Sequence, residues 1–526
     1  MPSACWERAG DTNTLVFCQV HPVDMALTRF ERFQAWILRT FKKVLLVLYQ
    51  LLASRPSDGS SKKLAPITNP LLMVSGIQLA QKIRLREVTC VEVVQAYIDR
   101  IEEVNPLINA IVKDRFSAAL QEAAQVDRLI DEEEGGEDVL KDRLPLLGVP
   151  FTVKAAFALQ GMPYSAGLVS RKGVISGVDA PLGSAEEGRN PYDMDRIVGG
   201  STGGEACILA SGGSVIGVGS DIGGSIRMPA FFNGIFGHKA SPGIVSNDGQ
   251  FPPCSGLEDD YLSTGPMCRY AEDLLPMLQI MAGPNAQRLS LSSEVDLRKL
   301  RFFSVPHDGG SVLVSPVDRE LLQIQRRVVE HLEADLGVKV QELRFPQLKY
   351  SFQIWSTFMN LPDKDGKPPT PFVDYMADHG KKVWPLWEMV KSFLGLSSHT
   401  VAAIGLALME MVESSEPDPF ILKQKEELQK ELEEVLGTDG VLLYPSHPLI
   451  APKHHHPIFT PFNFAYTGIF NILGLPVTQC PLGLSQGGLP LGVQVVSGKY
   501  LDRQTLATAL YLEKAFGGWR DPGSSS

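Results

Sequence analysis

Two segments rich in glycine and serine decide the fold: Gly-Gly-Ser-Thr-Gly-Gly-Glu at residues 199–205 and Gly-Ser-Asp-Ile-Gly-Gly-Ser-Ile-Arg at residues 219–227. An apolar stretch with the character of a helix followed by a strand separates them. In the first segment, Thr202 and Glu205 have capping-box spacing, which predicts that Ser201 lies just before a helix. In the second, glycines around the bend allow successive backbone N–H groups to converge near Ser225. Such convergence is what an anion nest or an oxyanion hole requires.

Taken alone, these segments have several interpretations. Glycine and serine are the default residues of turns and caps, which explain either segment by itself. A phosphate-binding loop usually ends in Gly-Lys-Ser or Gly-Lys-Thr, and neither segment carries a lysine. The Gly-x-Ser-x-Gly elbow of Ser-His-Asp hydrolases does not occur around Ser225, and no histidine is near either segment in the sequence. A serine nucleophile without a nearby histidine needs another base, and a buried lysine can serve.

One lysine has a suitable position. Lys154 directly follows the apolar stretch 147–153, at a strand end where a charge is costly and where a catalytic base would stand. The alternative is a lysine that extends its ammonium group into solvent at the margin of the sheet. Strands and helices alternate again over 300–343 and at 441–444. This repetition favours one large α/β domain over several small ones.

The composition excludes several classes of protein. The 526 residues are 44% hydrophobic and 21% charged, as in folded chains and unlike disordered ones. Acidic side chains number 60 against 49 basic ones, and the formal net charge of -11 predicts no nucleic-acid partner. The seven cysteines are scattered without CxxC pairs, which favours reduced thiols over disulfides or a metal site. The adjacent histidines at 454–456 do not share one face and are interpreted as a loop.

The amino-terminal part has a different character. Residues 1–24 form an irregular polar extension, and Met25 is an alternative start. Residues 25–53 contain an apolar stretch whose uninterrupted part is shorter than the roughly 20 residues of a membrane-spanning helix. Its apolar side chains share one helical face, which favours a helix in a membrane interface over one packed on the domain. Residues 54–66 are expected to form a linker.

The combination of Lys154 after a Gly-Val-Pro strand with the two glycine-serine segments resembles the amidase signature family of hydrolases. The resemblance extends from about Leu71 to Trp519. It implies an α/β fold, in which a single catalytic domain, placed at 67–520, is built on a large mixed, twisted sheet covered by helices. It also implies a Ser-Ser-Lys triad that uses no metal and no cofactor.

The resemblance assigns a role to each residue of the motifs. Ser225 is the acyl nucleophile, Ser201 the proton shuttle and Lys154 the base. Four successive backbone N–H groups are expected to hold the oxyanion: those of Ile222, Gly223, Gly224 and Ser225. Supporting roles are expected for three further residues: Thr202, Asp221 and Arg227.

Two features depart from the family pattern. Ala155 follows the lysine where relatives often carry an acidic residue. The stretch between Lys154 and Ser201 is shorter than in other members by roughly the 30 residues of one βαβ unit, and the shortening is placed between about 175 and 190. A splice variant or a faulty exon prediction would explain it. We expect the shortening to weaken both stability and turnover.

The leading hypothesis is a hydrolase that cleaves long-chain fatty-acid amides to a fatty acid and an amine. The alternatives are a catalytically impaired, membrane-associated lipid-binding homologue and an amidase for small polar amides. The segment 384–396, rich in tryptophan and leucine, predicts either a membrane cap with a lipid entrance or a core helix. The expected partners are a lipid amide and a membrane, at an intracellular site on an endomembrane or a lipid droplet. A second copy of the chain, in a homodimer, is a further candidate partner.

Overall fold

The computed structural model describes most of the chain beyond its amino-terminal part. The described residues are 63–133, 135–162, 166, 171, 188–254, 257–363, 365–377, 382–394, 396–399, 401–412 and 417–524. The predicted extension 1–24, the predicted helix 25–53 and most of the segment predicted to be shortened lie outside them. None of the helices in the described ranges has the length and hydropathy that a membrane span requires.

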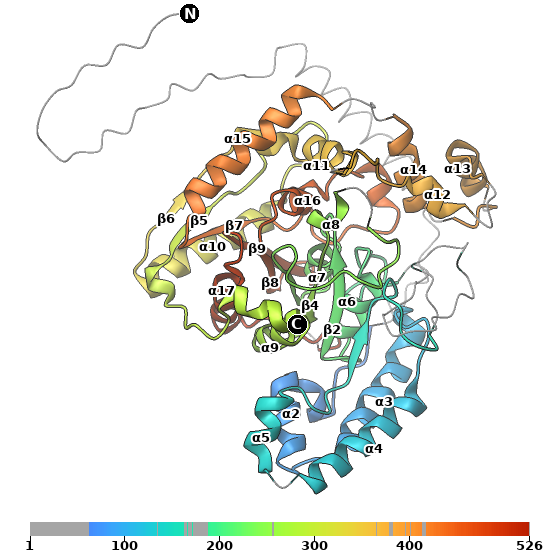
Figure 1. Ribbon diagram of the computed structural model, residues 1–526, viewed down its shortest axis with the longest axis vertical. Helices are drawn as coiled ribbons and strands as arrows, with labels where there is room; N and C mark the ends of the chain where they lie inside the picture. The colour runs from blue at the N-terminus through green and yellow to red at the C-terminus, as the bar shows by residue number, and fades with distance from the viewer. Residues whose placement is uncertain are drawn as a thin grey trace, which may run out of the picture. The chain divides into compact units, whose positions relative to one another are not determined.

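A nine-stranded mixed sheet, with the order β1-β2-β4-β3-β8-β9-β7-β5-β6, forms the centre of the described part (Figure 1). The strands are β1 Phe151–Val153, β2 Ile216–Asp221, β3 Phe236–Lys239, β4 Ser263–Cys268, β5 Arg301–Ser304, β6 Val340–Glu342, β7 Gly440–Tyr444, β8 Val477–Leu484 and β9 Pro490–Ser497. The pairs β1–β2, β5–β6 and β5–β7 are parallel, and the remaining pairs are antiparallel. The large mixed sheet that the resemblance implies is therefore confirmed.

Helices surround this sheet. The α-helices are α2 Gly76–Arg84, α3 Cys90–Ile108, α4 Phe116–Glu132, α5 Gly136–Arg143, α6 Gly203–Ala210, α7 Arg227–Phe232, α8 Glu258–Tyr261, α9 Leu274–Ala282, α10 Arg319–Leu336, α11 Ser351–Met359, α12 Phe372–Met376, α13 Pro385–Phe393, α14 Val401–Val412, α15 Pro419–Leu436, α16 Ala465–Ile472 and α17 Asp502–Phe516. Short 3-10 helices are η1 Pro70–Met73, η3 Ala271–Asp273, η4 Gly283–Leu289, η5 Leu297–Lys299, η6 Pro346–Tyr350 and η7 His456–Phe459.

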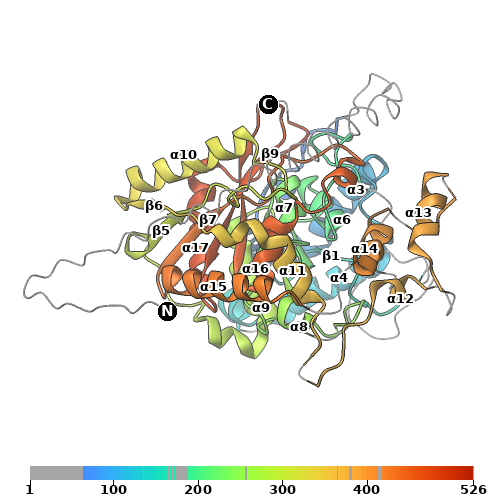
Figure 2. The same ribbon diagram turned by 90° about the horizontal axis from the view of Figure 1, so that it is seen from above.

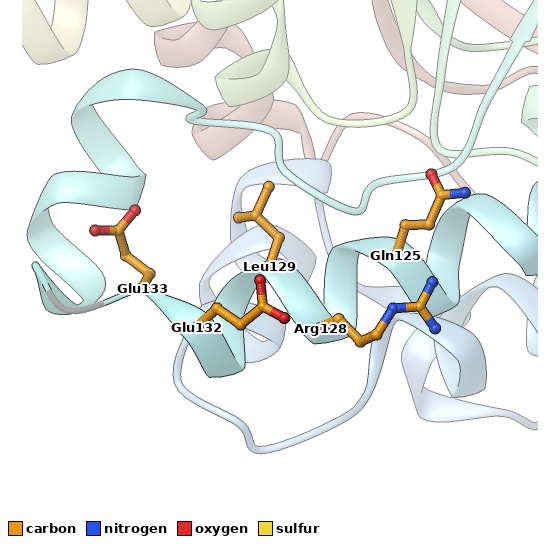
Figure 3. Close-up of a pocket in the computed structure, with 5 residues that line it drawn as sticks. All are labelled: Gln125, Arg128, Leu129, Glu132 and Glu133. Carbon is orange, nitrogen blue, oxygen red and sulfur yellow. The ribbon is translucent and has the colours of Figure 1, made fainter.

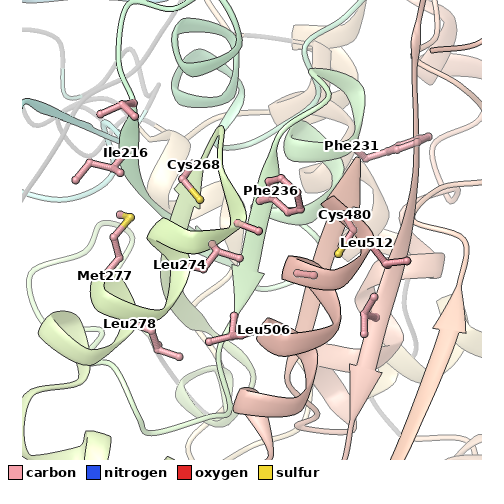
Figure 4. Packing of buried hydrophobic residues seen from close by; sticks show 14 of the residues in the cluster. Ile216, Phe231, Phe236, Cys268, Leu274, Met277, Leu278, Cys480, Leu506 and Leu512 are labelled. Atoms are coloured by element: carbon pink, nitrogen blue, oxygen red, sulfur yellow. The ribbon is translucent and has the colours of Figure 1, made fainter. Parts of the chain in front are cut away.

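Strand alternation divides the apolar side chains between the two faces of the sheet. In β5, Phe302 packs in a cluster with residues of α9, α10 and α17, whereas its neighbour Phe303 packs with α11, α15 and α16. The same division separates Val441 and Leu443 from Leu442 in β7. Figure 4 shows side chains of the first cluster between helix and strand. Because both faces are covered, the residues of the central strands β3, β7 and β9 are buried along the whole length of each strand.

The packed domain begins earlier than the sequence predicts. Leu64 is buried in a cluster with α3, and Arg100 donates a hydrogen bond to the carbonyl of Ala65. The amide of Ile67 donates to the carboxylate of Asp521 at 3.0 Å. The last residues of the predicted 54–66 linker therefore belong to the packed domain. Burial of the apolar Leu64 side chain stabilises this arrangement.

Three helices form a separate group at the periphery. Helices α12, α13 and α14 lie together, away from α10 and β6, in both views (Figures 1 and 2). Met376, Ile404 and Ala407 make a small apolar cluster of their own in this group. The segment 384–396 accordingly does not supply a core helix, since Trp384, Leu386 and Trp387 are exposed.

Candidate active site

Lys154 stands at the end of β1, beside both glycine-serine segments. Its amide donates to the carbonyl of Val218 at 3.1 Å, which continues the parallel pairing of β1 with β2 by one residue. Its Nζ atom lies 2.6 Å from Ser201 Oγ and 2.9 Å from Ser220 Oγ, and donates more weakly to the Ser220 carbonyl at 3.4 Å. The structure therefore brings the predicted base and the predicted shuttle into direct contact.

The environment of this amine changes its ionisation. Burial lowers the pKa of Lys154 from 10.5 to about 7, because desolvation disfavours the ammonium form, and the charge of Asp221 opposes the shift only partly. About half of the molecules then carry a neutral amine at neutral pH. A neutral lysine bonded to a serine hydroxyl can accept its proton. The alternative of a lysine that merely extends into solvent does not fit these contacts.

Ser201 is exposed and immediately precedes α6, whose cap is Thr202. The predicted capping box is wrong, because Thr202 makes no side-chain cap and donates weakly to the Ser220 carbonyl instead. Glu205 accepts a hydrogen bond from Thr152 of β1. Burial raises the pKa of Glu205 to about 8, although the bond from Thr152 opposes the shift, so this carboxyl is mostly neutral at pH 7.

A main-chain bond joins the two segments. The amide of Thr202 donates to the carbonyl of Ser225 at 3.1 Å. This bond holds Thr202, the neighbour of the predicted shuttle Ser201, against the predicted nucleophile Ser225. In the sequence, 24 positions separate Ser201 from Ser225. Ser225 itself is partly exposed, as a nucleophile that must meet a substrate has to be.

A fully buried ion pair supports the loop before Ser225. Arg227 Nη2 lies 2.9 Å from Asp221 Oδ1, and Nε lies 3.0 Å from Oδ2. Burial by itself would raise the pKa of Asp221, but Arg227, with Lys239 and Asn471, holds it well below its usual 3.8. The ionised carboxylate also accepts bonds from the amides of Gly224 and Ile226. The predicted supporting role of this pair thus has a concrete geometry.

Glycine is required at position 224. Its φ is +120°, and an added Cβ would lie 2.0 Å from Thr467 Oγ1 of α16. Thr467 Oγ1 in turn donates to the Gly223 carbonyl at 2.7 Å. Gly224 therefore lets α16 approach the loop backbone closely.

The four predicted oxyanion donors are not equivalent. The Gly224 amide donates to Asp221 Oδ1 at 2.7 Å and is already occupied. Within the described ranges, the amides of Ile222, Gly223 and Ser225 make no hydrogen bond to another protein group. These three N–H groups can receive a developing negative charge beside Ser225.

Sequence reasoning missed several residues that shape this site: Ser220, Trp355, Thr467 and Asn471. Ser220 lies inside the second segment and contacts Lys154. Its place in the glycine-serine segment, near the end of the predicted strand, could have indicated a contact with Lys154. The other three come from α11 and α16, more than 100 positions along the chain. No local pattern marks them, because only the tertiary fold brings them to the loop.

No group of histidine, cysteine, aspartate or glutamate side chains suited to a metal ion occurs in the parts of the chain that the structure describes. His454 and His455 lie at a turn before η7 and His456 is its first residue. His454 Nε2 contacts the carbonyl of Met194 at 3.1 Å. A hollow of about 540 Å³ lies on α4, lined by Gln125, Arg128, Leu129, Glu132 and Glu133 (Figure 3). It is open and contains none of the predicted site residues.

Comparison with known proteins assigns the family. The amidase family model matches residues 92–185 and 184–506 of this chain. The chain belongs to the amidase family. It is accordingly an amide hydrolase of the carbon–nitrogen class, and the resemblance seen in its motifs is confirmed. The division of the match falls in the segment predicted to be shortened, between about 175 and 190; the shortening itself stays a prediction.

Individual proteins are similar over most of their length. The chain is 68% identical to fatty-acid amide hydrolase 2-A of Danio rerio over 530 residues, covering 95% of this chain and 99% of the relative. It is 54% identical to fatty-acid amide hydrolase 2 of Homo sapiens, covering 88% and 93%. A solved structure of a fatty acid amide hydrolase superposes with a TM-score of 0.66 at 20% identity, covering 86% of each chain. That structural likeness supports the fold alone.

Proposed function

We propose that this chain hydrolyses long-chain fatty-acid amides with a Ser225–Ser201–Lys154 triad. The observation that carries the proposal is the 2.6 Å contact between Lys154 Nζ and Ser201 Oγ, made by an amine whose pKa is lowered to about 7. The close relatives named fatty-acid amide hydrolase 2 support the class of substrate. The product pair is a fatty acid and an amine.

The first half-reaction acylates Ser225. Neutral Lys154 takes the proton of Ser201 while its N–H groups remain bonded to Ser220, and Ser201 takes the proton of Ser225. The Ser225 alkoxide attacks the amide carbonyl, and the carbonyl oxygen becomes an oxyanion held by backbone N–H groups.

When the carbon–nitrogen bond breaks, Ser201 gives its proton to the leaving amine and regains one from the Lys154 ammonium. An amide needs this protonation because an amide anion is a poor leaving group.

The second half-reaction releases the fatty acid. Water gives a proton to the same Ser201–Lys154 relay and attacks the acyl carbon on Ser225. Collapse of this second oxyanion breaks the ester bond, and Ser225 regains its proton. The sum is one amide and one water converted to one acid and one amine, with every group of the triad restored.

Exposed apolar side chains on and around α13 support a lipid substrate delivered from a membrane. Trp384 and Trp387 expose 70% and 60% of their surface, and Leu386, Leu394 and Leu396 are similarly exposed. Large apolar side chains gathered in this way are typical of contacts with lipid or with another protein. The membrane contact, the intracellular location and the homodimer stay predictions.

The proposal is tested with purified protein and oleamide. We expect release of oleate, lost in Ser225→Ala, which cannot form the acyl intermediate. Butyramide serves as a matched short substrate: faster turnover of butyramide than of oleamide would favour an amidase for small amides. Binding of oleamide without any turnover would favour the impaired lipid-binding homologue.

A further inference from the structure

A tryptophan far from the motifs reaches the loop of the nucleophile. Trp355 lies on α11, and its Nε1–H donates to the carbonyl of Ile222 at 2.9 Å. The indole also faces Gly223, where an added Cβ would lie 3.5 Å from its ring atoms. The mechanism described above does not use this side chain. Its contact nevertheless falls on the peptide unit next to the reacting centre.

The geometry of a peptide unit gives this contact a consequence. A trans peptide is planar, with its C=O and N–H pointing in opposite directions. The bond between Ile222 and Gly223 is trans, since the cis bonds among the described residues are Gly200–Ser201 and Phe251–Pro252. A donor that holds the Ile222 carbonyl therefore also fixes the direction of the Gly223 N–H, which is one of the three unoccupied amides.

The neighbouring carbonyls of the loop are held in the same way. Their donors come from α16, from the loop's own helix and from Thr202: Asn471 Nδ2 to Asp221 O at 2.8 Å, Thr467 Oγ1 to Gly223 O at 2.7 Å, Met228 N to Gly224 O at 2.8 Å and Thr202 N to Ser225 O at 3.1 Å. Each backbone carbonyl from Asp221 to Ser225 thus accepts a hydrogen bond. Trp355 is the donor assigned to the peptide that carries the Gly223 N–H.

We propose that Trp355 is a positioning residue of the oxyanion hole, whose indole N–H holds the Ile222 carbonyl and thereby aims the Gly223 amide at the reacting carbonyl group. The inference rests on the proposed function and adds to it a residue of α11. Preorganised amides contribute because they do not have to reorient while charge develops.

The indole is itself held in a fixed place. Its ring meets Phe464 edge-on, with centroids 4.8 Å apart and an interplanar angle of 82°. At Gly468 of α16, an added Cβ would lie 3.0 Å from the indole. This glycine lets the ring approach α16 closely, and the ring is not free to swing away from Ile222. A ring held in this way can keep its N–H directed at the Ile222 carbonyl.

The experiment removes the indole N–H and keeps an aromatic side chain at position 355. Trp355→Phe and a chain with 3-benzothienylalanine at position 355, which keeps the bicyclic shape, are compared with wild type on oleamide and on methyl oleate. We expect kcat to fall by about 10-fold to 100-fold for both substrates, less than the loss of a whole oxyanion donor, with KM changed less than about threefold. Equal losses on amide and ester are expected because both pass through an oxyanion.

The matched control is Trp519→Phe. Trp519 Nε1 also donates to a backbone carbonyl, that of Ala210, at 3.0 Å, but at the end of α6 opposite to Ser201. Its loss should lower the melting temperature without lowering kcat in the folded protein. A general loosening of the fold would affect both tryptophan variants alike, whereas an oxyanion effect belongs to Trp355 alone.

Labelling by a fluorophosphonate separates this inference from the proposed function. Wild type that labels at Ser225, with labelling and kcat slowed by similar factors in both Trp355 variants, supports the inference. Unchanged rates in the benzothienyl chain overturn it, as does a loss confined to the amide substrate, which would indicate the proton relay. If Trp355→Phe does not fold, the benzothienyl chain decides. Wild type that neither labels nor hydrolyses overturns the proposed function, and the inference with it.

Discussion

The ionisation of Lys154 makes the rate of amide hydrolysis depend on pH. The neutral amine starts the proton relay, so kcat/KM should rise with pH through about 7 and level off above it. The sign follows from the direction of the shift: below pH 7 the ammonium form dominates and has no lone pair. One pH unit below the pKa, activity should be about one tenth of the plateau.

The size of the effect follows from the shift that burial produces. A lysine with the ordinary pKa of 10.5 would be neutral in only about one molecule in 3,000 at pH 7, whereas a pKa of about 7 leaves half of the molecules neutral. Desolvation thus raises the population of the reactive form by about 10³. Lys154→Arg, whose side chain stays charged, should lose at least this factor at neutral pH.

The assay is steady-state hydrolysis of oleamide from pH 5 to pH 10, with methyl oleate as the comparison substrate. Lys154→Ala should show no plateau near pH 7 and should recover partly at high pH, where hydroxide can replace the base. The ester should lose less, because its leaving group does not need the proton that the relay returns. A wild-type profile that is flat from pH 5 to 8, or a fully active Lys154→Arg, would refute the reasoning.

Three further predictions concern the buried ion pair, the exposed tryptophans at α13 and the segment between about 175 and 190. Asp221→Asn leaves the buried guanidinium of Arg227 uncompensated and should lower the free energy of unfolding by about 3–5 kcal/mol in urea titrations, with loss of activity; an unchanged midpoint would contradict this. Replacing both Trp384 and Trp387 by glutamate should weaken co-sedimentation with phosphatidylcholine vesicles while leaving hydrolysis of detergent-dispersed oleamide intact. Restoring a family-length segment between about 175 and 190 should raise the melting temperature and the turnover, and equal values would show the shorter chain to be competent.

The sequence was sufficient for the parts of the site that are local in the chain. Lys154 follows an apolar strand, and the glycines around Ser225 mark a tight loop, so burial and backbone geometry could be predicted directly. The prediction of one mixed sheet came from the resemblance rather than from periodicity, because apolar strands covered on both faces do not reveal their neighbours.

The errors have a common physical cause, which is competition from tertiary partners. Glu205 does not complete the predicted capping box because Thr152 of the adjacent strand takes its carboxyl. The Gly224 amide, predicted to hold the oxyanion, is taken by Asp221. Trp355 could not be found from the sequence, since its role depends on one contact made across the fold. Local sequence patterns thus predicted the identity of the site residues better than the hydrogen bonds that these residues make.

The most direct test of the account is the identity of the residue that becomes covalently modified. A fluorophosphonate attacked by the activated serine leaves a stable adduct, whose position mass spectrometry can locate. We predict modification of Ser225 in wild type, no modification in Ser225→Ala, and slow modification in Lys154→Arg at pH 7. Stoichiometric modification of another side chain, or undiminished labelling of Ser225→Ala, would contradict it.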